Sequence, residues 1–288
     1  MKKLLIIGCI SLMGLFSVAQ GSDLIITSGA EKKTFYTLGT NLSKLLKEKP
    51  KVETSKGSMQ NLEKLDEGKA HIGFAFADSY ALYIKNHPQA VNKLNIIGKA
   101  GKGCLYVAVN KNGKVKSEDD LQKDGVLVAV GKEGAGANAT WDFAGVLDKE
   151  YKKPGIVYQG DAIALNALAT QAPQAIGNSH MPISAVLQMQ NPSVNNKFVN
   201  DVLANKNLEF IDFDDYSLDG KLPNGEKIYS VEKIDIQKRL MNDKEIKTIC
   251  TDTLIIANSE LVDDDLMEQL AEISLNKQSS ILIGTTDE

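Results

Sequence analysis

The residues best suited to chemistry lie where an extended segment turns into a helix. Four such positions are predicted along the chain: Thr34, Ser58, Asp78 and Ala137. The start of a helix presents backbone N–H groups without intrahelical partners and a partial positive charge, and both favour an anion. Gly57 and Gly136 precede two of these starts and would let the backbone approach a ligand closely. The pattern predicts an anion-binding cleft, with ordinary N-caps and turns as the alternative at each single position.

Two further side chains are candidates for the same site. Lys56 stands beside Gly57 and could supply a cation, with a solvated surface lysine as its alternative. His180, near the end of a predicted strand, could reach the cleft. Arg239 is the only arginine and falls in an irregular region, so the bidentate guanidinium grip on a carboxylate is not expected. A carboxylate would therefore be held by helix-start amides, hydroxyls or lysine.

Alternating strands and helices would position these residues. Apolar residues recur at spacings of three and four from 34 to 47, as on one face of a helix. The expected strands are 23–28, 51–55, 72–76, 94–98, 104–109, 125–130, 155–158, 175–178 and 249–257, and the expected helices are 34–47, 58–67, 78–86, 137–147, 161–169, one from 117 and one from 263. This alternation predicts an α/β fold of two lobes, each a mostly parallel sheet flanked by helices. From 191 to 242 the pattern blurs.

The first residues are typical of a secretory signal peptide. Two lysines precede an apolar run over 4–18, and small residues occupy the −3 and −1 positions of a cleavage site before Gln20. This run is shorter than the roughly 20 residues that a membrane-spanning helix needs. A signal peptide over 1–19 predicts export to the periplasm. Cys9 lies in a lipoprotein-like segment, but the apolar run before it is short, so lipidation is not expected.

The composition is that of a globular protein with room for two domains. Of 288 residues, 43% are apolar and 24% are charged, and the net charge of −4 gives no basis for a nucleic-acid partner. Export would permit a disulfide between Cys104 and Cys250, but the sequence cannot bring them together, and two buried thiols are expected. His71, His87 and His180 lack metal-ligand spacing, and no nucleophile elbow occurs. No metal, cofactor or catalytic residue is expected.

Five short motifs follow one another along the chain. They are TFYTLG at 34–39, GSMQNL at 57–62, a leucine, small residues and a buried strand from 65 to Asp78, VKSEDDL at 115–121 with VAVG at 128–131, and GAG at 134–136. In this order they resemble the TAXI family, the extracytoplasmic solute receptors of one class of TRAP transporter, with its T-Y-Y-x-L-G, G-S-x-x-N-L and G-S-G motifs. The similarity extends from about residue 24 to residue 273, which is nearly all of the exported chain.

The resemblance implies a type II periplasmic-binding-protein architecture. One lobe would comprise 20–108 with 250–288 and the other 109–249, joined by hinge strands near 107–110 and 248–253. A small solute, a carboxylate or an amino acid, would bind between the lobes, and a monomeric receptor would deliver it to the membrane subunits of a TRAP transporter. The ligand-binding residues so implied, with those identified above, are Thr34, Tyr36, Lys56, Gly57, Ser58, Asp78, Gly134, Gly136, Ala137, Asn138 and His180.

Three departures from the family pattern leave the solute open. Charged residues at 31–33 replace glycines, FAD at 76–78 replaces Q-S-D, and GAGAN at 134–138 replaces G-S-G-T-E. Several hydroxyls and an amide are thereby lost, and Phe76 adds apolar surface. The amino-acid ligand common in the family is therefore in doubt for this chain.

Two other functions fit parts of the sequence. GAGANA at 134–139 has the form of a dinucleotide fingerprint, and Asp161 lies about twenty residues further on. The turn between Val130 and Gly134 is long, however, and the motif opens the second series of elements rather than the first. A dinucleotide-dependent oxidoreductase is therefore the weaker alternative, and a periplasmic sensor or interaction protein on the same fold is the stronger one.

Overall fold

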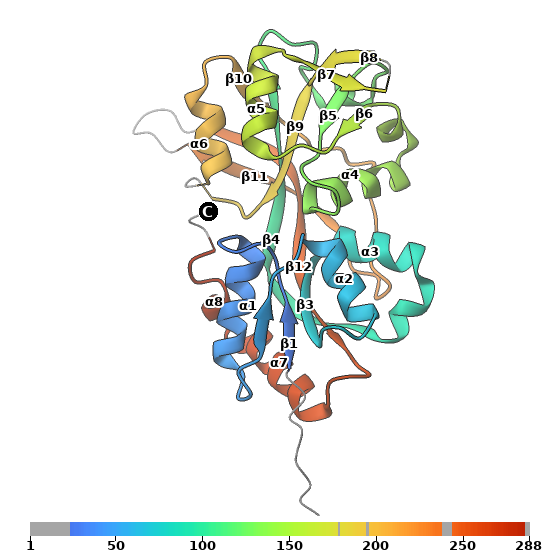
Figure 1. The fold of residues 1–288 in the computed structure, drawn as a ribbon, viewed down its shortest axis with the longest axis vertical. Coiled ribbons are helices and arrows are strands. Elements are labelled where there is room, and N and C mark those ends of the chain that lie inside the picture. Colours follow the sequence, from blue (N-terminus) through green and yellow to red (C-terminus); the bar gives the residue numbers. More distant parts are fainter. Residues whose placement is uncertain (1–23, 178, 194–195, 238–243, 286–288) are drawn as a thin grey trace, which may run out of the picture.

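Two long antiparallel strands run through the whole molecule. In the computed structural model, which describes residues 24–177, 179–193, 196–237 and 244–285, these strands are β4 (Leu94–Asn110) and β12 (Lys244–Asn258). The other elements gather around the two ends of this pair and form two lobes, one below and one above in Figure 1. We call them the first and the second lobe.

The first lobe extends the sheet from β12 through β3 and β1 to β2, and these three outer strands are parallel to one another. Its elements are β1 (Ile25–Thr27), α1 (Thr34–Leu45), β2 (Lys51–Glu53), α2 (Ser58–Asp66), β3 (Ile72–Phe76), α3 (Ala77–Asn86), η1 (Pro88–Asn92), α7 (Asp264–Asn276) and α8 (Gln278–Ile281). Every residue of β3 is buried, as its apolar run predicts. The helical spacing of apolar residues in α1 likewise places Phe35, Leu38 and Leu42 in the core.

The second lobe extends the sheet from β4 through β9 and β5 to β6, with β10 on β4 and β11 on β12. Its elements are η2 (Glu118–Gln122), β5 (Leu127–Ala129), α4 (Gly136–Leu147), η3 (Lys149–Lys152), β6 (Gly155–Val157), α5 (Asp161–Thr170), β7 (Pro173–Ile176), β8 (Ser179–Pro182), β9 (Ala185–Gln190), α6 (Lys197–Ala204), β10 (Leu208–Ile211) and β11 (Tyr229–Gln237). Strands β9, β5 and β6 are parallel, whereas β4 and β12 run against their neighbours. The sheet is therefore mixed rather than mostly parallel.

The α/β fold expected from the sequence is confirmed, with corrections in detail. The segments 94–98 and 104–109, expected as separate, are parts of the one strand β4. The blurred region from 191 to 242 contains α6, β10 and β11, and β9 was not expected at all. The lobe boundaries at 108/109 and 249/250 fall inside β4 and β12, which belong to both lobes, and they remain a prediction.

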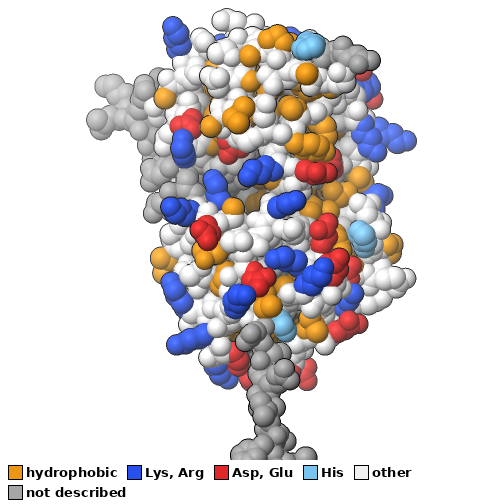
Figure 2. Space-filling view, viewed as in Figure 1, with side chains coloured by type: hydrophobic (Ala, Val, Ile, Leu, Met, Phe, Trp, Pro, Cys, Tyr) orange, Lys and Arg blue, Asp and Glu red, His pale blue; other side chains and the backbone are white. Residues whose placement is uncertain are grey.

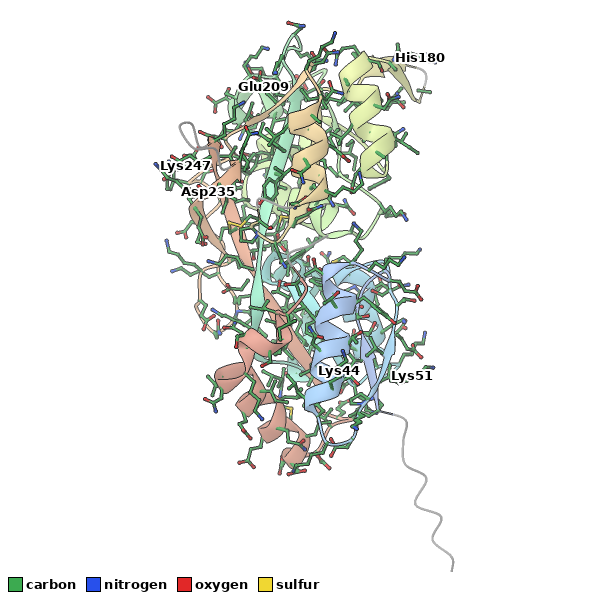
Figure 3. The ribbon with its side chains drawn as sticks, turned by 90° about the vertical axis from the view of Figure 1, so that its left-hand side faces the viewer. Lys44, Lys51, His180, Glu209, Asp235 and Lys247 are labelled. Atoms are coloured by element: carbon green, nitrogen blue, oxygen red, sulfur yellow. A yellow bond between two sulfur atoms is a disulfide. The ribbon has the colours of Figure 1, made fainter. Side chains whose placement is uncertain are left out.

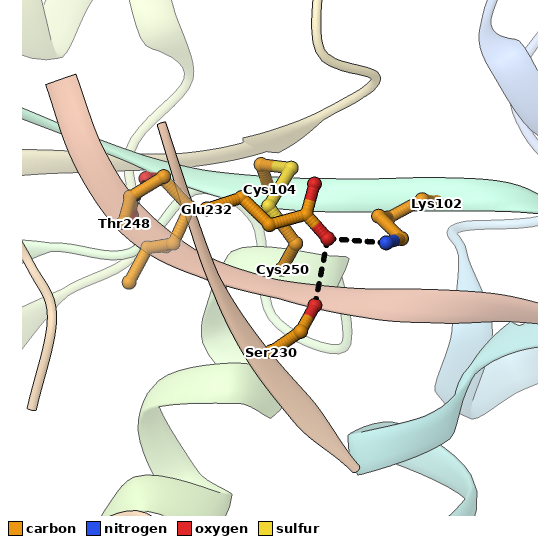
Figure 4. The surroundings of a disulfide bond; sticks show 7 residues. Lys102, Cys104, Ser230, Glu232, Thr248 and Cys250 are labelled. Atoms are coloured by element: carbon orange, nitrogen blue, oxygen red, sulfur yellow. Dashed lines mark hydrogen bonds and ion pairs between the residues drawn. A yellow bond between two sulfur atoms is a disulfide. The ribbon is translucent and has the colours of Figure 1, made fainter. Parts of the chain in front are cut away.

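The expectation of two buried thiols is wrong. Cys104 and Cys250 form a disulfide, with an S–S distance of 2.08 Å, and both side chains are buried. The register pairs of β4 and β12 end at Lys102 and Asp252, after which β4 pairs with β9 and β12 with β11. The bridge therefore joins the two strands where they part on entering the second lobe (Figure 4). Because the two cysteines are 146 residues apart in the sequence, their proximity could not be predicted from it.

The predicted signal peptide over 1–19, with Cys9, lies outside the described residues. Within the described part of the chain, no helix has both the length and the apolar character needed to span a membrane.

Candidate ligand-binding cleft

A cavity of about 350 Å³ lies between the two lobes. It is lined by residues of the segments 29–35 and 56–58 and Phe76 from the first lobe, and of the segments 131–136, 160–161 and 188–191 from the second. Small-molecule sites have volumes of roughly 300–1,000 Å³, so a small solute fits. Figure 2 shows basic side chains gathered across the middle of this face, where the lobes meet.

Besides α3, whose N-cap Phe76 forms part of the wall, four helices begin at this cavity, two from each lobe. The N-cap residues, all of which line it, are Lys33 of α1, Gly57 of α2, Ala135 of α4 and Gly160 of α5. None of these four residues makes a side-chain capping hydrogen bond. The helices converge from below and above on the space between the lobes (Figure 1). The junction therefore presents backbone N–H donors and the partial positive charge of four helix starts, a combination that favours an anion.

Three lysines add full positive charges to the wall. Lys33 and Lys56 come from the first lobe and Lys132 from the second, and all three are exposed. Asp161, in the first turn of α5, is the acidic residue of the lining. Burial raises the pKa of the Asp161 carboxyl, and the nearby charges of Lys33 and Lys132 oppose that rise. Three cations against one carboxyl leave the cavity electropositive.

The floor of the cavity is apolar. Phe76, at the end of β3, crosses toward the second lobe, and its ring centroid lies 5.1 Å from that of Phe35. A Cβ atom on Gly103 would come within 2.4 Å of the Phe76 ring, and one on Gly136 within 2.6 Å. The ring therefore fits only because both positions are glycine. Met189 of β9 completes this floor.

Five of the eleven sequence-predicted site residues line the cavity. These are Thr34, Lys56, Gly57, Ser58 and Gly136. Ser58 is fully buried, and its Oγ accepts a hydrogen bond of 3.2 Å from the backbone N–H of Phe76. This hydroxyl therefore helps to hold Phe76 in the floor of the cavity. Gly57 has a φ of 132°, a conformation that favours glycine, and brings α2 against the second lobe beside Gly134.

Five others lie away from the cavity lining. Tyr36, Gly134, Ala137 and Asn138 are neighbours of lining residues without being part of the lining. The Asn138 side chain accepts from the Gly134 N–H at 2.9 Å and donates to Asp142 at 3.0 Å, so it shapes the loop before α4. His180 is exposed on β8 at the end of the second lobe farthest from the first (Figure 3).

Asp78, the eleventh, ties the lobes together behind the cavity. It is fully buried at the start of α3, and its carboxylate accepts hydrogen bonds from Thr140 Oγ1 at 2.6 Å and from Tyr229 OH at 3.1 Å. Thr140 lies on α4 of the second lobe. Burial raises the pKa of Asp78, because desolvation outweighs these hydrogen bonds. The N-cap of α3, Phe76, lines the cavity, but the Asp78 carboxyl accepts the Ser79 N–H of the first turn at 2.6 Å, so this helix start is already paired within the protein.

Sequence reasoning missed several lining residues. Lys33 and Phe35 flank the predicted Thr34, and Gln188, Met189 and Gln190 belong to the unexpected strand β9. Asp161 was noted only for the dinucleotide alternative. A glycine before a helix start marks a junction without a side-chain cap, and Gly160 before Asp161 carries this signal just as Gly57 does before Ser58.

The cavity has the chemistry of a binding site. Its polar groups include helix-start amides, three lysines, the Asp161 carboxyl, the Thr34 and Ser58 hydroxyls and the side-chain amides of β9. Among the described residues, one cluster has metal-ligand character, formed by Cys104, Glu232 and Cys250. Both of its sulfur atoms are joined in the disulfide, and Glu232 pairs with Lys102 (Figure 4).

Two α/β lobes joined by two long strands, with a ligand-sized cavity between them, define the type II periplasmic solute-binding fold. The chain belongs to the NMT1-like family, whose model matches residues 26–281. A comparison with curated proteins finds no match.

Solved structures share this fold at low sequence identity. GshT of Streptococcus mutans, from a study of glutathione import, has a TM-score of 0.51 at 14% identity, over 91% of this chain and 95% of its own. XAC2383 of Xanthomonas citri, bound to ATP, has a TM-score of 0.52 at 8% identity, over 92% and 89%. YhfZ of Shigella flexneri has a TM-score of 0.52 at 13% identity, over 91% and 87%. Identities this low establish the fold and leave the ligand open.

Proposed function

We propose that the protein is a periplasmic receptor that captures a small anionic organic solute, a carboxylate or an amino acid, and delivers it to the membrane subunits of a TRAP-type transporter. One observation carries the proposal. Four helices from two lobes start at one cavity, and none of the four starts has a side-chain cap. An anion is the ligand whose charge and acceptor atoms complement this junction.

The residue roles follow from position. The amides at the starts of α1 and α2 bind one side of the anion, and those of α4 and α5 bind the other. Lys56 and Lys132 add charge from opposite lobes. Phe76 and Met189 contact the carbon skeleton of the solute, since they form the apolar floor.

Location and partner rest on separate support. A disulfide between Cys104 and Cys250 is typical of an oxidising compartment, which favours the export that the first 19 residues predict. Delivery to a TRAP-type carrier is supported by the TAXI-like motifs. GshT belongs to a study of import by an ABC importer, so a receptor of this fold can serve another class of carrier.

The dinucleotide alternative is less well supported. In that fingerprint the glycine backbone approaches a pyrophosphate. Here the Gly134 N–H is bonded to Asn138 Oδ1, and Gly136 faces the Phe76 ring. The Gly134 amide is therefore already paired within its loop, and the Phe76 ring occupies the space beside the Cα of Gly136.

A thermal-shift screen of the chain from residue 20 onward tests the proposal. Small carboxylates, amino acids and uncharged sugars are compared, and the anions are expected to raise the melting temperature. A ligand at a hundredfold excess over its Kd stabilises the native state by about 2.7 kcal/mol. Stabilisation by sugars alone would refute an anion receptor.

Lys56→Ala then tests the site itself by isothermal titration calorimetry. We expect binding of the selected anion to weaken by about 0.5–2 kcal/mol, the scale of a partly solvated charge-assisted bond. Lys44→Ala is the matched control, because Lys44 is exposed in the last turn of α1, at the end away from the cavity. Figure 3 shows it on the first lobe, far from the second. Equal effects of the two substitutions would remove Lys56 from the site.

A further inference from the structure

A second cavity adjoins the cleft at the start of α5. Its volume is about 370 Å³, and it shares Lys33, Gly160, Asp161 and Gln190 with the lining of the first cavity. Beyond these shared residues it continues along the first turn of α5 to the first turns of α6. The ligand space is thus a cleft with a side chamber, and not a single closed pocket.

The accessible chemistry of this chamber differs from that of the cleft. Its additional charged residues neutralise each other, because Lys197 Nζ and the Asp201 carboxylate form an ion pair of 2.6 Å. The remaining lining is apolar, and its accessible surface comes from Ala162 and Ile163, since Phe198 is buried. The cleft attracts an anion, whereas the chamber offers surface to hydrocarbon.

Ile163 is the residue that makes this wall accessible. Its exposed fraction is 65%, whereas the other large apolar residues of α5, Leu165 and Leu168, are buried. A single exposed isoleucine on a convex surface would need no explanation. Ile163 instead faces a concave space that is continuous with the anion-binding junction, which is where a ligand gains from apolar contact.

We infer that the solute is an amphiphilic carboxylate, with its anionic head at the four helix starts and an apolar acyl or alkyl extension along Ile163 in the side chamber. The inference rests on the proposed function and narrows its solute class. Lys33 and Asp161, which belong to both cavities, flank the passage from head to extension. A short dicarboxylate or a simple amino acid fills the cleft alone and leaves the Ile163 wall in water.

A chain-length series of butyrate, hexanoate and octanoate tests this assignment by isothermal titration calorimetry. Each fully buried methylene contributes about 0.8 kcal/mol, close to a fourfold gain in affinity. Four added methylenes on an open wall are buried only in part, so octanoate is expected to bind about tenfold or more tightly than butyrate. A stoichiometry of one solute per protein in the titration would distinguish this site from nonspecific adsorption.

Substitutions at Ile163 locate the effect. Ile163→Ala removes apolar surface and Ile163→Trp fills the chamber, and both should reduce the advantage of octanoate while leaving butyrate binding unchanged. Leu275→Ala is the matched control, since Leu275 is 82% exposed on α7 of the first lobe, outside both cavities. It should leave the whole series unaltered. Circular dichroism melts of each variant separate loss of binding from loss of fold.

The outcomes distinguish the two levels of the proposal. Equal affinities along the series, or an octanoate advantage that survives both Ile163 variants, would overturn the side-chamber assignment. The anion receptor would stand in that case if Lys56→Ala still weakens binding of a short anion. If no anion of the screen raises the melting temperature, the proposed function fails together with the inference.

Discussion

The disulfide gives a stability prediction whose size follows from its position. Cys104 and Cys250 are 146 residues apart, so the bridge closes a loop that contains almost the whole second lobe. Chain-entropy arguments assign a cross-link over such a loop about 5 kcal/mol of stabilisation, and measured losses of native disulfides are typically about 2–5 kcal/mol. The variant with Cys104→Ala and Cys250→Ala together should therefore lose about 2–5 kcal/mol of unfolding free energy.

Urea unfolding monitored by circular dichroism measures this loss. The double variant is preferred to a single one because it leaves no free thiol, and alanine is preferred to serine because a buried hydroxyl without a partner costs about 1–3 kcal/mol. Wild-type protein that is reduced in urea and refolded under reductant is the control. Its midpoint should approach that of the double variant, since both lack the cross-link.

Two results would refute this reasoning. A double variant within about 0.5 kcal/mol of the wild type would mean that the bridge does not constrain the unfolded chain. Two titratable thiols in unreduced, urea-unfolded protein purified after export would mean that the bridge does not form. Either result would also withdraw the support that the disulfide gives to an oxidising compartment.

Three further predictions concern other parts of the molecule. Burial raises the folded-state pKa of Asp78 above its ordinary value of 3.8, so its contribution to stability is complete below that pH and is lost as the pH rises through the folded pKa. Urea unfolding between pH 4 and 7 should show Asp78→Asn gaining stability relative to wild type as the pH rises, and a constant difference would contradict this. Gly136→Ala should cost about 1–3 kcal/mol by crowding the Phe76 ring, whereas Gly145→Ala in the same helix meets only the flexible Lys152 side chain and should be tolerated. Intact-mass analysis of exported protein should give a chain that begins within two residues of Gln20, and an acylated Cys9 at the N-terminus would contradict the cleavage site.

Most elements of the first lobe could be predicted because their apolar patterns are clear, but the short helices η1 and α8 were not expected. The apolar spacing of α1 and the continuous apolar run of β3 leave little choice of structure. β4 was divided because glycines at 98, 101 and 103 interrupt its pattern. In the structure these glycines allow close packing. A Cβ on Gly98 would collide with Ser274, and one on Gly103 would collide with Phe76. The need for glycine at these positions is set by segments distant in the sequence, so the local sequence pattern does not indicate it.

The site could be predicted only in part for a related reason. The sequence indicates where helices begin, and α1, α2 and α4 do start at the cavity. Which way a helix start faces depends on strand order, and this order is set by pairings between distant segments. Asp78, predicted to bind the ligand, accepts a hydrogen bond from Thr140 Oγ1 instead. The fourth helix that begins at the cavity is α5, which follows the edge strand β6 in the chain.

The contacts between the lobes are unevenly distributed around the cleft. Three contacts join α4 and the loop before it to the first lobe: Phe76 against Gly136, Gly57 beside Gly134, and Asp78 bonded to Thr140. On the side of α1 and α5, the lobes face each other across the cavity and its chamber, with Lys33 opposite Asp161. A ligand shifts a conformational equilibrium only by its differential affinity for the two states. Among the described residues, the hydrogen bond of 3.1 Å from Asn191 Nδ2 to Thr285 O also joins the lobes beside α1. A solute that contacts the starts of α1 and α5 would add a second bridge on this side, whereas one held by α2 and α4 alone would add to a side that α4 already joins. Closure of the lobes should therefore respond most strongly to solutes that reach α5.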